Sequence, residues 1–128
     1  MVMLILNGTD GEHCVLHDFG GDGPPLLMTH GNGLNAGMWA TAVPFLQSQR
    51  RCFGLDFRGH GACRVSKAPL DVDRSRLVSE VLQAVSKVSD EPIDALGHSL
   101  GGATLLRAEL ENANTFRKLW LFEPVMVP

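Results

Sequence analysis

The sequence predicts an α/β fold in which a mostly parallel sheet is covered by helices on both faces. Two observations carry the prediction. From residue 25 onward apolar strand-like runs alternate with helical segments, and one of these, residues 72–88, shows apolar positions at three- and four-residue spacing. Such alternation forms parallel sheets through right-handed crossovers. No repeat, low-complexity tract or linker divides the 128 residues, so we expect a single domain over residues 1–128.

Six strands are expected from the apolar runs and the turn residues between them. The first two are short and are separated by a glycine-containing turn. The third is a continuous apolar run, typical of a strand buried on both faces. The expected strands are residues 3–6, 14–17, 25–29, 52–55, 92–96 and 119–122.

Three helices are expected between these strands. A short one surrounds Phe45, with Pro44 in its first turn, where proline is tolerated. In the helix over residues 72–88 the apolar face packs on the sheet and the other face meets water. That polar face consists of Arg76, Glu80, Gln83 and Lys87. The helix over residues 100–110 is expected to bury a stripe of Ala103, Leu106 and Leu110.

Charge and composition exclude several kinds of partner. The net charge is −3, the pI is near 5.9, and the basic residues are scattered, so neither nucleic acid nor a membrane surface is expected as a partner. No apolar run reaches the roughly 20 residues of a membrane span, and no secretion signal precedes the first strand, so a cytoplasmic location is expected. The three cysteines lack metal-ligand spacing, which favours reduced, partly buried thiols.

A serine nucleophile is expected at Ser99. Residues 97–101 read Gly-His-Ser-Leu-Gly and fall between an expected strand and an expected helix, the context that a nucleophile elbow requires. The turn is tight, so the positions two before and two after the serine must be small, as Gly97 and Gly101 are. A serine that only caps a helix is the alternative for an isolated match, and the flanking strand and helix favour the nucleophile.

Two backbone N–H groups are expected to form an oxyanion hole for this serine. The N–H of Leu100 lies at the start of a helix, where amides lack intrahelical acceptors and the dipole is positive. The second donor is expected in residues 30–33, His-Gly-Asn-Gly, with Asn32 as the candidate. His30 and His98 are interpreted as structural hydrogen-bonding residues, and His98 is expected to project away from the serine.

Three motifs in this order resemble the α/β-hydrolase superfamily. Residues 23–31 resemble its third strand and oxyanion loop, residues 56–61 resemble the turn after its fourth strand, and Ser99 matches the nucleophile. The resemblance implies a three-layer α/β-hydrolase fold, truncated after about the sixth strand and without the lid and later strands. Within the turn, Asp56, Arg58 and His60 are interpreted as turn and packing residues.

The resemblance also implies which catalytic groups the chain holds. A serine at the elbow implies acyl transfer through a serine ester and argues against epoxide hydrolases and dehalogenases, which use a carboxylate. In the family the acid and then the histidine follow the serine, whereas all five histidines here precede Ser99 and only 29 residues follow it (128 minus 99). Glu123 is the candidate acid, the alternative being an ordinary polar residue at a strand end.

Two further expectations concern the surface. The near wall of the substrate pocket is expected to include Gly31, Asn32, Leu34 and His98, joined by Met38 and by Trp39, which is also interpreted as a core residue. The last strand would have no neighbour on its outer side, so we expect self-association through it.

The leading hypothesis is a serine hydrolase that acts on an ester or related acyl substrate, a small molecule, without a cofactor or a metal. Without a general base the chain by itself is expected to be weakly active or inactive. The alternative is a non-catalytic fragment or pseudoenzyme that serves as a binding or assembly module. Lyase or perhydrolase chemistry at the same serine stays open, because the sequence does not define the pocket.

Overall fold

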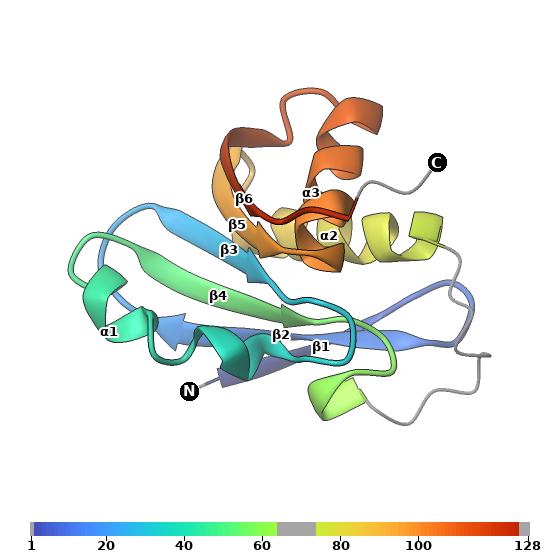
Figure 1. Cartoon of the computed structure of the whole chain (residues 1–128), viewed down its shortest axis with the longest axis horizontal. Coiled ribbons are helices and arrows are strands. Elements are labelled where there is room, and N and C mark those ends of the chain that lie inside the picture. The colour runs from blue at the N-terminus through green and yellow to red at the C-terminus, as the bar shows by residue number, and fades with distance from the viewer. Residues whose placement is uncertain (1, 64–73, 126–128) are drawn as a thin grey trace.

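The computed structural model describes residues 2–63 and 74–125. Within these residues six strands form one sheet in the order β1-β2-β4-β3-β5-β6 (Figure 1). The strands are β1 Val2–Asn7, β2 His13–Gly20, β3 Pro25–Thr29, β4 Arg51–Asp56, β5 Ile93–His98 and β6 Phe116–Phe122. The helices of the described residues are the 3-10 helices η1 Ala36–Trp39 and η2 Gly61–Cys63 and the α-helices α1 Val43–Leu46, α2 Arg74–Val88 and α3 Leu100–Glu111.

The strand directions confirm the predicted fold class. Strands β4, β3, β5 and β6 are mutually parallel, whereas β2 runs antiparallel to both β1 and β4. All six expected strands are present, and the last begins three residues earlier than expected, at Phe116. The expected start of the second helix at residue 72 lies outside the described residues.

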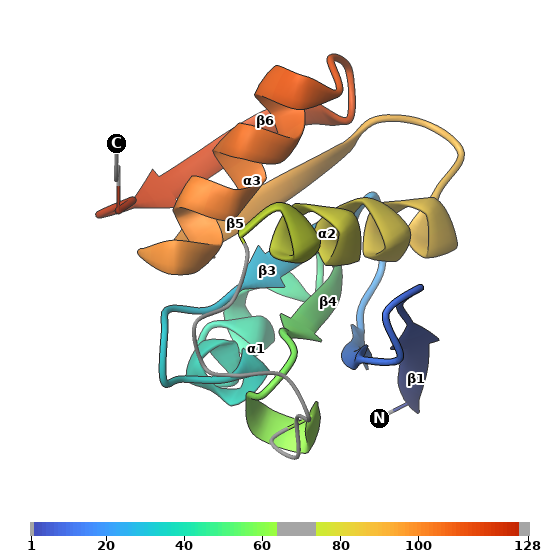
Figure 2. The same cartoon turned by 90° about the vertical axis from the view of Figure 1, so that its right-hand side faces the viewer.

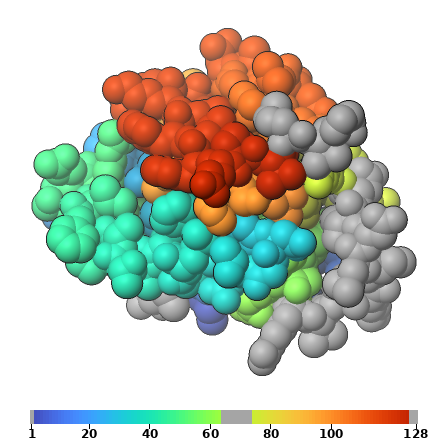
Figure 3. Space-filling view, viewed as in Figure 1, coloured from blue at the N-terminus to red at the C-terminus, as the bar shows by residue number. Residues whose placement is uncertain are grey.

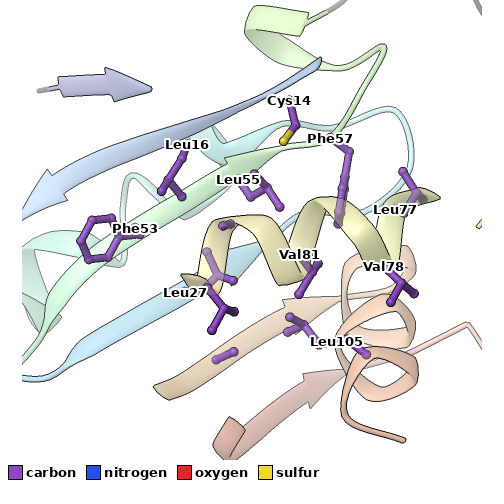
Figure 4. Close-up of a cluster of buried hydrophobic side chains, with 14 of the residues drawn as sticks. Cys14, Leu16, Leu27, Phe53, Leu55, Phe57, Leu77, Val78, Val81 and Leu105 are labelled. Carbon is purple, nitrogen blue, oxygen red and sulfur yellow. The ribbon is translucent and has the colours of Figure 1, made fainter. Parts of the chain in front are cut away.

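Helices cover both faces of the sheet, because β3 and β4 are apolar on both sides. Figure 2 shows α2 and α3 on the side of the sheet opposite α1. On that face Leu27 and Leu55 pack with Val81 of α2 and Leu105 of α3, all of them 0% exposed (Figure 4). On the other face Met28 belongs to a smaller cluster with residues of α1 and β4. The sheet therefore forms the middle of three layers. The carboxyl ends of its parallel strands lie at one edge, the carboxyl edge, and the loops that follow these strands begin there.

The expectation that Glu80 faces solvent is wrong. Its side chain is 4% exposed, and its carboxylate accepts hydrogen bonds from the backbone N–H of Arg58 at 3.0 Å and from the Nε of Arg58 at 2.6 Å. A polar position on an amphipathic helix is buried here because a buried cation from a distant turn compensates its charge. Burial nevertheless raises the pKa of Glu80, against the opposing effect of Arg58.

The expected buried stripe of α3 is also wrong. The fully buried positions of the helix are Gly101, Gly102, Thr104, Leu105 and Ala108, while Ala103 and Leu106 are half-buried and Leu110 is 76% exposed. The close approach of Gly101 to β3 fixes the rotation of the helix about its axis. Positions three, four and seven residues after Gly101 must then face the sheet.

The three cysteines are free, as expected, and they are fully buried rather than partly buried. Burial raises the pKa of Cys63 to about 12 and raises the pKa of Cys14 still further, so these thiols are protonated at neutral pH. Within the described ranges, none of the helices combines the length and the apolar character that crossing a membrane demands.

Candidate active site

Ser99 stands at a sharp turn between β5 and α3. Its backbone has φ 52° and ψ −115°, a left-handed conformation that is strained for any residue with a Cβ. The turn is held by neighbours on both sides: the Ser99 N–H donates to the carbonyl of Phe122 in β6 at 2.9 Å, and the N–H of Ala103 donates to the Ser99 carbonyl at 3.0 Å. This is the strand-turn-helix geometry expected of a nucleophile elbow.

The two glycines of the motif are required by contact distances. A Cβ added to Gly97 would lie 2.7 Å from the Cα of Gly102, and a Cβ added to Gly101 would lie 2.6 Å from the carbonyl oxygen of His30. Both neighbours are backbone atoms, which cannot rotate away. The strand can therefore turn into the helix at Ser99 only with glycine at these two positions.

The loop after β3 lies beside this elbow. Strands β3 and β5 are parallel neighbours, with Thr29 paired to Gly97, so residues 30–33 leave the sheet next to Ser99. Gly31 faces His98 so closely that a Cβ there would lie 2.8 Å from the His98 Nδ1. The His98 Nδ1 is buried and has no hydrogen-bond partner among the described residues.

His30 fixes the orientation of the first peptide unit in that loop. Its Nε2 accepts a hydrogen bond from the Phe57 N–H at 3.1 Å, so the proton is on Nδ1, which donates to the Gly31 carbonyl at 2.8 Å. Burial lowers the pKa of His30 to about 4, so the ring is neutral at pH 7. This is the structural role expected of His30.

The anchored Gly31 carbonyl determines where the next amide points. The peptide between Gly31 and Asn32 is trans, so the Asn32 N–H points away from the side on which His30 holds the carbonyl. No acceptor among the described residues pairs with this N–H. The first amides of α3, including Leu100, likewise lack intrahelical acceptors. Two candidate oxyanion donors thus stand at the carboxyl edge of the sheet with Ser99.

Apolar side chains surround this edge. Leu34 is 41% exposed and follows the loop directly, while the ring of Trp39 lies 6.3 Å from the ring of Phe122. Trp39 also donates from Nε1 to the Thr29 carbonyl at 3.0 Å and packs against the smaller core cluster, while its side chain stays partly exposed. Met38 is half-buried beside it. In the space-filling view the segment after β3, in cyan, lies against the end of β6, in red (Figure 3).

The turn after β4 supports the same edge. The carboxylate of Asp56 accepts from the Ala36 N–H at 2.7 Å and the Ala62 N–H at 3.0 Å, and lies 2.6 Å from the His17 Nε2. Burial alone would raise the pKa of Asp56, but these N–H groups and His17 lower it below its ordinary value. Asp56 thereby joins β2, η1 and η2, a packing role that matches its interpretation from the sequence.

The groups that would activate Ser99 are not assembled in the described residues. Glu123 follows β6 with φ 46°, is exposed, and makes no hydrogen bond with them, so its role as the acid stays a prediction. None of the five histidines, all of which are described, is hydrogen-bonded to Ser99. In residues 2–63 and 74–125 the serine and the candidate donors thus come together without a general base.

Comparison with known proteins gives consistent matches. A family model described as the alpha/beta hydrolase fold matches residues 24–128. The chain is 33% identical over 111 residues to protein phosphatase methylesterase 1 of Homo sapiens, covering 83% of this chain and 28% of that protein. It is also 33% identical over 88 residues to a pimeloyl-[acyl-carrier protein] methyl ester esterase of Methylococcus capsulatus, covering 69% of this chain and 32% of that protein.

A solved structure is similar over almost the whole chain. The crystal structure of an alpha/beta hydrolase fold protein from Burkholderia ambifaria has a TM-score of 0.83 and 27% identity, covering 97% of this chain and 44% of that one. The chain therefore spans about a third or less of the two curated relatives, and less than half of the solved structure.

Proposed function

Because this chain belongs to the α/β-hydrolase fold family, we propose that it carries the nucleophile and the oxyanion donors of a serine hydrolase that cleaves carboxylic esters. The observation that carries the proposal is the strained backbone of Ser99 between β5 and α3, enclosed by positions where only glycine fits. A turn that served only to cap a helix would need neither the strain nor the close contacts.

The proposed reaction begins at the Ser99 hydroxyl. Its oxygen attacks the ester carbonyl carbon while a base takes the proton, and the carbonyl electron pair moves onto oxygen. The N–H groups of Leu100 and Asn32 stabilise that oxyanion, each contributing roughly 3 kcal/mol in a dry site. The C–O bond to the alcohol then breaks as the alkoxide takes the proton back from the base, which leaves an acyl-serine and a free alcohol. Water hydrolyses the acyl-serine to the carboxylic acid and free Ser99.

We propose that the base is a histidine that is not among the five of this sequence. His30 uses both ring nitrogens in structural hydrogen bonds, and His17 donates from Nε2 to the Asp56 carboxylate and makes no hydrogen bond with Ser99. The proposal is supported by the small share of the curated relatives that this chain spans. Glu123 remains our candidate for the acid that would orient that histidine.

An ester of a small alcohol is the proposed substrate class. Both curated relatives named above are described as methylesterases or methyl ester esterases. The exposed Leu34 and the Trp39–Phe122 pair offer apolar contacts for the acyl portion of the substrate.

Covalent labelling by an alkyl fluorophosphonate tests the proposal. The Ser99 oxygen should form a bond to phosphorus slowly, with loss of fluoride, because the oxyanion donors assist the attack without a general base, and labelling should disappear in Ser99→Ala. Ser79→Ala, which removes an exposed serine of α2, is the matched control and should leave labelling unchanged. Native protein that reacts no faster than Ser99→Ala would favour the alternative, a non-catalytic binding or assembly module.

A further inference from the structure

We propose that His60 is a positioning residue for the oxyanion hole, acting by holding residues 30–33 in the conformation that presents the Asn32 N–H. The inference rests on the proposed function, since it assigns a role in presenting one of the donors named there. His60 comes from the turn between β4 and η2, and its ring lies 4.9 Å from the ring of His30.

The tautomer of His60 follows from its two partners. Its Nδ1 lies 2.9 Å from the Arg58 carbonyl, which can only accept, so Nδ1 carries the proton. The Nε2 lone pair then accepts the backbone N–H of Gly33 at 3.0 Å. Asn32 Oδ1 lies 3.3 Å from the same nitrogen, but both of these atoms are acceptors in this tautomer, so Gly33 is the donor.

The two histidines hold the two peptide units that flank Asn32. His30 binds the Gly31 carbonyl, which belongs to the peptide before Asn32, and His60 binds the Gly33 N–H, which belongs to the peptide after it. With both planes held, the backbone torsions of Asn32 are set, and so is the direction of its N–H. Gly33 itself has φ 78°, a conformation that glycine adopts without strain, and the Leu34 N–H donates to the Gly31 carbonyl at 3.1 Å, which closes the turn.

The support for His60 is itself rigid. Arg58, whose carbonyl holds the ring, has a side chain that is 4% exposed and is paired with Glu80 of α2 and with Asp10. The turn is therefore fixed to the core on one side and to the loop on the other. Without the imidazole, the Gly33 N–H faces solvent at an exposed loop position, and the Asn32 torsions are restrained only through the Gly31 carbonyl, which accepts from His30 and from the Leu34 N–H.

Two substitutions of His60 distinguish the effect of losing the hydrogen-bond acceptor from the effect of changing the volume of the side chain. His60→Phe keeps a ring of similar size and removes the acceptor, whereas His60→Gln places an amide oxygen where Nε2 stood and can still accept from Gly33. The spectrum of each ¹⁵N-labelled variant shows whether the sheet is intact. Amide hydrogen exchange at Gly33 reports the bond directly, and wild-type protein should also show a scalar coupling between the Gly33 amide nitrogen and the His60 Nε2.

The expected result is that Gly33 exchanges about tenfold faster in His60→Phe than in wild type, with His60→Gln close to wild type. Labelling by the fluorophosphonate should show a maximal rate about tenfold lower in His60→Phe at unchanged reagent affinity, and rescue in His60→Gln. Unchanged Gly33 exchange in a folded His60→Phe would overturn the inference, as would an affinity loss at constant maximal rate. If wild-type Ser99 is not labelled at all, the proposed function fails, while Gly33 exchange still decides whether His60 holds the loop.

Discussion

Replacing Glu80 by alanine is expected to lower the free energy of unfolding by about 3–5 kcal/mol. The side chains of Glu80 and Arg58 are each 4% exposed, and the carboxylate accepts two hydrogen bonds from Arg58. Alanine leaves the guanidinium buried with one remaining carboxylate, Asp10, at 2.5 Å from Nη1. Truncating one member of a buried ion pair is costly because the other charge stays desolvated without compensation.

A second arginine on the same carboxylate provides the control. Arg76 also binds the Asp10 Oδ2, at 2.6 Å, but its side chain is 48% exposed. Arg76→Ala should therefore cost less than about 1 kcal/mol. Glu80→Gln should fall between the two, since it keeps an acceptor for the Arg58 N–H and loses the charge.

Urea denaturation at pH 7, followed by circular dichroism, measures all three variants against wild type. A Glu80→Ala cost no larger than that of Arg76→Ala would refute the assignment of Glu80 to the buried side of α2. The double variant with Arg58→Met should recover part of the loss, because it removes the uncompensated charge.

Three further outcomes are expected. Gly101→Ala should abolish fluorophosphonate labelling and destabilise the fold, because its Cβ would lie 2.6 Å from the His30 carbonyl; normal labelling in that variant would contradict the tight elbow. The folded-state pKa of His30 is lowered from 6.5 to about 4, so its contribution to the free energy of unfolding is fully present above pH 6.5 and is lost as pH falls toward 4. Denaturation at several pH values should therefore show that the free energy of unfolding falls over this range by about 3 kcal/mol less in His30→Gln than in wild type. Trp120→Ser should reduce concentration-dependent self-association in sedimentation runs, because Trp120 is 41% exposed on the edge strand β6; a wild type that stays monomeric at high concentration would refute the edge proposal.

The strands and the elbow could be predicted because their signals are local. A continuous apolar run such as residues 25–29 is stable where both of its faces are buried, in the middle of a sheet. The glycines of residues 97–101 are required by close contacts in and beside the turn. The order of strand, serine and helix in the sequence was enough to predict that Ser99 lies at the turn between β5 and α3.

The errors come from contacts between residues far apart in the chain. Glu80 is buried because Arg58, 22 residues away in sequence, compensates it, and helical periodicity carries no information about that partner. The helix η1 was not predicted, although Asn35 caps it locally by accepting the Gly37 N–H; the bond from the Ala36 N–H to Asp56, across 20 residues, has no local signal. The buried face of α3 was assigned from apolar residues alone, whereas the contact of Gly101 with β3 sets it.

The role proposed for His60 was missed for the same reason. The motif of residues 56–61 identified it as part of a turn, and nothing local indicates that its Nε2 reaches Gly33, 27 residues earlier. The signal that could have found it is the presence of two polar motifs after neighbouring parallel strands, since β3 and β4 deliver their loops to the same edge of the sheet.

The central claim, that Ser99 is a nucleophile with an oxyanion hole, is tested most directly by locating an acyl group on the protein. The chain is incubated with p-nitrophenyl acetate, quenched with acid, digested and analysed by mass spectrometry. We expect an acetyl group on the peptide that contains Ser99, formed slowly because only the oxyanion donors assist the attack, retained because deacylation also lacks a base, and absent in Ser99→Ala. An unmodified Ser99 peptide, with acetylation confined to exposed lysines, would contradict the account.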